Sequence, residues 1–280
     1  MAQDLVAQEQ TTPAVIAGLS DEDREALRRA VIALERPSLV ARLANIVGRP
    51  LEVLGHSLPA PVRDAVSSAA EAALRASLRV ALTTLRKEGA PSPRALHGTL
   101  AAASGAIGGA LGLATLPVEL PISTTLMLRA IAEIARQEGE DLADPEAALA
   151  CVQVFALGGR SDADNLAESG YFAVRSALAK SVSEAARFVT ERGVAEGAPA
   201  LVRLAAQIAS RFGVVVSQKV AAQAVPVVGA IGGAAVNAAF MNHFQAIARG
   251  HFTVRRLERA YGKAPVQVAY DDLRREEGLA

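Results

Sequence analysis

The 280-residue sequence predicts an all-α fold, a single globular multi-helix domain, and three observations support this. Apolar residues recur with the 3.6-residue period of a helix through most of the chain. The sequence has no sustained period-two run rich in β-branched and aromatic residues, and the nearest, GVVVSQ at 213–218, lies within a helical pattern. Helix start and stop residues also punctuate the chain.

These start and stop signals place the helices in order. Ser20 precedes three acids, which is typical of a capped helix start, and Asp144 with Pro145 forms a second such start. Gly158 and Gly159 end the helix that Pro145 begins. The expected helices run from Ser20 through a stop or kink at Pro37 to Gly48, over residues 61–87, 123–137, 145–157, 166–190 and 201–224, and from the second glycine-rich stretch to about Tyr261.

The composition does not shift along the chain, so one domain is expected. It consists of a flexible N-terminal tail over residues 1–19, a helical domain over 20–262 and a C-terminal tail over 263–280. Acids stand near the N-terminus where a signal peptide needs basic residues, so the expected location is the cytoplasm.

The hexapeptide GAIGGA occurs twice, at residues 105–110 (the first copy) and 229–234 (the second copy). Neither copy has the glycine spacing, the preceding strand or the lysine of a phosphate-binding loop, so nucleotide binding is not expected. The four-residue spacing of glycines lets two helix backbones approach closely. We therefore expect two glycine-rich helices packed in the core through Gly105, Gly108, Gly109, Gly112, Gly229, Gly232 and Gly233.

A membrane offers an alternative setting for both copies. They lie in uncharged stretches, residues 98–118 and 220–242, of about the length that spans a bilayer. Insertion through these stretches is therefore one alternative. Their Ala, Gly, Ser and Thr content and the polar Gln223, Asn237 and Asn242 favour a protein core instead.

The overall charge and the cysteine count narrow the classes of partner. Lys plus Arg equals Asp plus Glu at 29 each, and aromatic residues make up only 4% of the chain, so nucleic-acid binding is not expected. The single cysteine, Cys151, excludes an internal disulfide and a multi-cysteine zinc site, and its apolar neighbours predict a core position.

Three residues are candidates for catalysis: Glu119, His243 and His251. Glu119 is the one acid in an apolar segment, a setting typical of a general acid, although it could instead cap the next helix or pair with Arg129. The two histidines are eight residues apart, about 80° around a helix, which is not the spacing of paired metal ligands. No metal site and no cofactor are expected, and a lipid-acting enzyme is a second alternative.

The last long helix combines an apolar stripe with a basic face. The basic face consists of Arg249, Arg256, Arg259 and Lys263. Such a face suits anionic lipid headgroups, although an ordinary solvated face has the same pattern.

Three groups of segments also carry a family resemblance. They are GAIGGALGLATLPVELP followed by LMLRAIAEIA, then VFALGG with the later ESGYFAVR, and finally VPVVGAIGGAAVNAAFMNHFQAIARGHFTVRRLERAYG. Together they cover about residues 60–262 and resemble the EcsC family of bacterial proteins. The resemblance implies a helical protein, and the family's namesake accompanies the components of an ABC exporter whose loss affects protein secretion. It implies no catalytic set.

These patterns together predict a non-enzymatic protein at the inner face of the cell membrane. It is expected to be a peripheral accessory or lipid-binding protein, and the resemblance implies a link to envelope, secretion or ABC-transport physiology. The expected partners are membrane lipids with anionic headgroups, or a membrane transport complex.

Overall fold

The computed structural model of the chain describes residues 18–35, 39, 43–45, 59–85, 116–159, 170–195, 197–223 and 229–279, with the backbone alone for 229–232. Over these residues every regular element is a helix, which confirms the all-α prediction. The elements are α1 (Asp21–Glu35), α4 (Ala60–Val80), the π-helical turn η1 (Ala81–Leu85), α6 (Leu116–Gln137), α7 (Pro145–Leu157), α8 (Tyr171–Arg192), α9 (Pro199–Gln223), α10 (Gly229–Tyr261) and α11 (Lys263–Glu276).

Two of the predicted caps hold the starts of α1 and α7. Ser20 Oγ accepts a hydrogen bond from the backbone N–H of Asp23 at 3.2 Å, and Asp144 Oδ1 accepts one from the backbone N–H of Glu146 at 3.2 Å. Each bond satisfies an N–H group that the first helical turn leaves open.

The start of α6 differs from the prediction. The helix begins at Leu116 and not at Ser123, and it continues through Pro121. Pro117 occupies the first turn, where the missing N–H of proline needs no partner. Both prolines therefore lie within α6 and do not precede it.

Helix α7 lies in the middle of the core. Every residue from Ala147 to Ala156 is buried, and α7 packs against α6, α8, α9 and α10. The ring of Phe155 contacts those of Phe212 and Phe244, with centroids 5.1 and 5.3 Å away. A helix that is apolar on all sides belongs inside a protein. Cys151 on this helix is fully buried, as predicted, and burial raises the pKa of its thiol to about 12.

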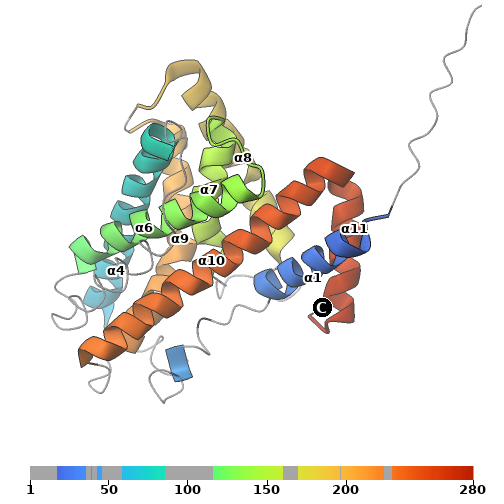
Figure 1. Cartoon of the computed structure of the whole chain (residues 1–280). Helices are drawn as coiled ribbons and strands as arrows, with labels where there is room; N and C mark the ends of the chain where they lie inside the picture. Colours follow the sequence, from blue (N-terminus) through green and yellow to red (C-terminus); the bar gives the residue numbers. More distant parts are fainter. Residues whose placement is uncertain are drawn as a thin grey trace, which may run out of the picture.

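Helix α10 joins the two sides of the molecule. At 33 residues it is the longest described helix, and it runs from lower left to upper right in Figure 1. Helices α6, α7 and α9 pack against it on one side of the fold, while α1 and α11 pack against it and against each other. The N-terminal and C-terminal helices therefore meet on α10 (Figure 1).

Helix α11 corrects the expected C-terminal tail. Residues 263–276 form a helix whose Val266, Tyr270 and Leu273 are buried. These three residues recur about one turn apart, and the rest of the segment is mostly polar, so the stripe is narrow. Arginines of α1 form ion pairs with glutamates at and just beyond the end of α11, and these hold the two helices together.

Close packing also occurs at two glycines outside the GAIGGA copies. A Cβ at Gly250 of α10 would lie 2.8 Å from Leu34 Cγ of α1, and one at Gly158 would lie 2.6 Å from a ring carbon of Phe244. The second copy of GAIGGA begins α10. The first copy lies outside the described residues, so the packing of the two copies on each other stays a prediction.

Candidate functional site

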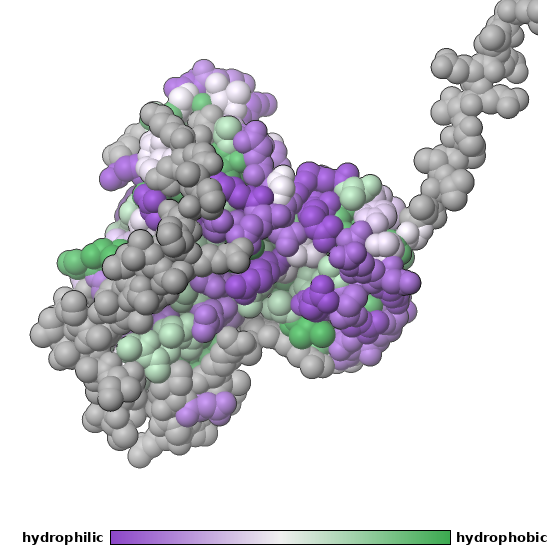
Figure 2. Space-filling model, in the orientation of Figure 1, coloured by the Kyte–Doolittle hydropathy of each residue, from purple (hydrophilic) through white to green (hydrophobic). Residues whose placement is uncertain are grey.

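The N-terminal end of α6, residues 116–123, exposes two large apolar side chains and buries an acid. Val118 is 66% exposed and Ile122 is 50% exposed, and these two side chains stand one turn apart on the same outer face. Glu119 and Leu120, between them, are buried. Figure 2 shows hydrophobic residues at the left edge of the molecule, over this end of α6. We call this segment the inverted end of α6.

The buried carboxylate at the inverted end has two partners on other helices. Lys219 of α9 donates a hydrogen bond from Nζ to Glu119 Oε1 at 2.7 Å, and Asn237 of α10 donates one from Nδ2 to the same oxygen at 3.3 Å. Lys219 is fully buried, with Nζ 5.3 Å from the centre of the Phe240 ring. Burial lowers the pKa of Lys219, and the charge of Glu119 opposes that change.

The structure contradicts both structural roles predicted for Glu119, a helix cap and a pair with Arg129. The residue lies inside α6 and so does not cap a following helix, and its ion pair is with Lys219 and not with Arg129. A buried ion pair contributes little net stability, because desolvation of both charges offsets their attraction. Its clearest effect is to join α6, α9 and α10 at one point beneath the inverted end.

The two candidate histidines lie elsewhere in the core. His243 is buried, with Nε2 at 2.8 Å from the backbone oxygen of Gly158. His251 is buried, with Nδ1 at 2.8 Å from the hydroxyl of Tyr171. The structure therefore does not bring the two histidines and Glu119 into one catalytic group.

Burial also fixes the charge state of His251. Desolvation lowers the pKa of His251 well below its ordinary value, and the nearby positive charges of Arg175 and Arg255 lower it further. Among the described residues no cluster of three or more His, Cys, Asp or Glu side chains could hold a metal ion.

Two members of the predicted basic face have carboxylate partners within the protein. Arg256 bonds to Asp23 at 3.0 Å and to Glu138 at 2.9 Å, and Arg259 bonds to Glu140. Arg249 and Lys263 are exposed, and Arg249 donates to Gln245 Oε1 at 3.3 Å. A lipid contact by this face stays a prediction, and the ion pairs reduce its available charge.

A polar cleft of about 620 Å³ lies between α1 and α10 beside this face. Its charged lining residues are three arginines and three acids: Arg29, Arg249, Arg256, Glu22, Asp23 and Glu138. Because the two signs balance, the cleft has no charge preference that would select an anion or a cation.

One described helix is long and apolar enough to cross a membrane by length and composition. It is α9, with a mean hydropathy of 1.4 in its most apolar window, of which 44% is buried in the fold. The core helix of a globular protein has the same properties, and α9 carries the buried Lys219. Of the predicted span 98–118, residues 98–115 lie outside the described residues and 116–118 begin α6. The predicted span 220–242 includes the end of α9 and the start of α10.

The fold and the site together define an all-α single-domain protein in which the inverted end of α6 lies over a buried ion pair. Residues 22–257 match the sequence profile of the EcsC protein family, and the chain belongs to this family. No curated protein and no solved structure gives a significant match to the chain.

Proposed function

We propose that this protein is a peripheral membrane protein that contacts lipid from the cytoplasmic side through the inverted end of α6. It acts as a non-enzymatic accessory or lipid-binding factor in envelope or transport physiology. The observation that supports the proposal is the exposure of Val118 and Ile122 directly beside a buried, ion-paired Glu119. The chain belongs to the EcsC family, and the resemblance to that family implies an accessory role, because its namesake accompanies the components of an ABC exporter.

The energetics of the inverted end favour a lipid surface over water. Each large apolar side chain that leaves water contributes roughly 1.5–3 kcal/mol when it is fully buried. A carboxylate on the same face would oppose that contact, since charges are costly in hydrocarbon. Glu119 is turned inward and paired with Lys219, so the outer face of this segment presents no acid to the lipid.

The charge of the proposed lipid surface follows from the partners that the sequence predicts. Those partners are anionic headgroups, so the proposed lipid surface is anionic.

Vesicle flotation tests the proposal. The full chain is mixed with phosphatidylglycerol-containing vesicles and floated through a density gradient. We expect the wild-type protein to float with the vesicles. The double variant Val118→Asp/Ile122→Asp should lose at least about tenfold in partitioning, because it places two carboxylates on the contact face.

The matched control is Val268→Asp on α11. Val268 is 62% exposed, close to the value for Val118, but it lies on a different helix at the other end of α10. This variant should float like the wild-type protein. Equal flotation of the double variant and the wild type would exclude the inverted end of α6 as the contact surface.

A further inference from the structure

The inverted end of α6 is held only in part by the backbone hydrogen bonds of its own helix. Pro121 lies inside α6, so it cannot donate the hydrogen bond that an interior residue gives to the carbonyl four positions earlier, here that of Pro117. Ser123 Oγ donates to the backbone oxygen of Leu120 at 3.1 Å. Thr125 Oγ1 donates to the backbone oxygen of Pro121 at 2.8 Å, and such side-chain bonds weaken and bend a helix. The orientation of the inverted end therefore depends on its contacts with other helices.

The inner side of the inverted end combines apolar anchors with a charge. Leu116 and Leu120 are buried, and Glu119 is buried beside them. Burial of the two leucines is favourable, whereas burial of a carboxylate is costly unless a cation neutralises it. The inner side is therefore stable in the core only while Glu119 has its cation.

Lys219 of α9 supplies this cation. Among the described residues it is the one lysine or arginine with no exposed surface, and buried valines flank it at 216 and 220. A lysine is almost never fully buried unless it is paired. The pair with Glu119 contributes little net stability, because desolvation of the two charges offsets their attraction. Its role is therefore better sought in the position that it gives to α6.

We infer that Lys219 is a positioning residue for the lipid contact. By neutralising Glu119 inside the fold, it holds the inverted end with Val118 and Ile122 facing outward. Without Lys219, the end separates from α9 and α10, and Glu119 reaches the contact side. The inference rests on the proposed function, because the face that Lys219 positions is the proposed lipid contact.

The fluorescence anisotropy of a single tryptophan tests this positioning without lipid. The chain contains no tryptophan, so Val118→Trp places one reporter on the inverted end, at a position that is 66% exposed. Adding Lys219→Met should lower the anisotropy, because the end then moves independently of the fold. Adding Glu119→Gln to that variant should restore the anisotropy, since a neutral amide can stay inside without a cation.

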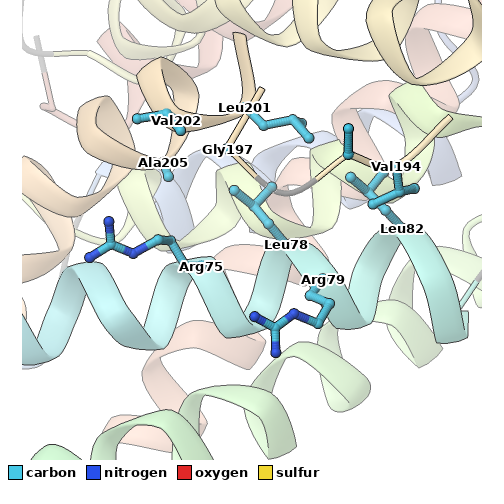
Figure 3. Close-up of a pocket in the computed structure, with 10 residues that line it drawn as sticks. Arg75, Leu78, Arg79, Leu82, Val194, Gly197, Leu201, Val202 and Ala205 are labelled. Carbon is cyan, nitrogen blue, oxygen red and sulfur yellow. The ribbon is translucent and has the colours of Figure 1, made fainter. Parts of the chain in front are cut away.

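The matched control reporter is Val202→Trp near the start of α9. Val202 is 43% exposed and lines an apolar pocket between α4 and α9, which Figure 3 shows. It stands on the same helix as Lys219 but roughly 25 Å away along the helix axis. Lys219→Met should leave the anisotropy of this reporter unchanged. A fall at both reporters would show that α9 as a whole has loosened, which would overturn the positioning role.

A charge swap keeps the inference testable if circular dichroism shows that Lys219→Met does not fold. Glu119→Lys/Lys219→Glu restores an ion pair of reversed polarity and should keep the wild-type anisotropy of the Val118→Trp reporter. A mobile end in the folded swap would overturn the inference. Unchanged anisotropy in folded Lys219→Met would also overturn it, because Glu119 would then have taken up a proton and stayed inside.

Vesicle flotation separates this inference from the proposed function. Lys219→Met should float no better than Val118→Asp/Ile122→Asp, because it brings a carboxylate to the contact face. Glu119→Gln/Lys219→Met should float like the wild type. Full flotation of a variant with a mobile end would overturn the role of Lys219 in the contact. If the wild type itself does not float, the proposed lipid contact fails, while the anisotropy still decides whether Lys219 positions the inverted end.

Discussion

At the scale of single residues, His251 is a neutral imidazole held inside the protein. Burial raises the pKa of Tyr171 to about 12, so its hydroxyl stays protonated. That hydroxyl accepts a hydrogen bond from Arg175 at 3.4 Å and lies 2.8 Å from His251 Nδ1. The phenol and the neutral imidazole therefore share one buried hydrogen bond, and the tautomer of His251 decides which of the two donates.

The lowered pKa of His251 predicts acid sensitivity. Below about pH 6.5 the unfolded chain takes up a proton at this residue and the folded chain does not, so stability falls as the pH falls. Between about pH 7.5 and about pH 5.5 the loss from this group is about 1.4 kcal/mol. Urea unfolding at both pH values should show that loss in the wild type and a correspondingly smaller loss in His251→Asn. Equal pH dependence in the two proteins would show that His251 titrates normally in the folded state.

The sequence predicts which charged residues are candidates for the site but not their ion-pair partners. The sequence singles out Glu119 as the acid in an apolar segment, but its partner Lys219 lies 100 positions away. Asp23, a partner of Arg256, lies 233 positions away, and Glu140, a partner of Arg259, lies 119 positions away. Charge pairing within a helix follows a fixed spacing, whereas pairing between helices depends on how the helices pack.

At the scale of helices, the crossing of α1 and α10 depends on the small size of Gly250. A Cβ at this position would meet Leu34 Cγ at 2.8 Å and the backbone oxygen of Ala30 at 3.2 Å. Backbone atoms of α1 cannot shift without moving the whole helix. The crossing is therefore intolerant of even one added carbon.

A pair of glycine substitutions tests this crossing. Gly250→Ala should lower the free energy of unfolding by about 1–3 kcal/mol, as overpacking in a core does. Gly213→Ala is the matched control, because Gly213 lies inside α9 and a Cβ there would meet no atom within 4 Å. That change should stabilise the protein by about 0.5–1 kcal/mol, since alanine favours the helix more than glycine. Urea unfolding of each variant and of the wild type measures both changes in the free energy of unfolding. A stabilising Gly250→Ala would contradict the close crossing.

The sequence predicts a helix end well where a nearby side chain caps the helix. The caps at Ser20 and Asp144 are confirmed because each uses side chains only two or three residues away. The sequence predicts too late a start for α6, because a proline breaks a helix in its interior but fits the first turn at its start. The sequence does not predict α11, because the buried stripe of this helix has only three residues, and α1 and α10 supply the surface that covers it.

At the scale of the whole molecule, the proposed membrane contact involves one end of one helix and no spanning segment. Alkaline carbonate should therefore release the protein from a membrane fraction into the supernatant. High salt alone should release less, because the contact is mainly apolar and salt screens charges. Retention in the pellet after carbonate would favour the alternative of insertion through residues 98–118 and 220–242.

Because α1 packs against α10 and α11, it cannot complete its packing until these two helices have been synthesised. Helix α1 leaves the ribosome early, yet the helices that cover Leu27 and Val31 are among the last to be made. At about 5–20 residues per second, α1 waits on the order of tens of seconds for its partners. A chain that terminates before α10 leaves α1 uncovered, so we expect truncated products to be readily degraded by cellular proteases.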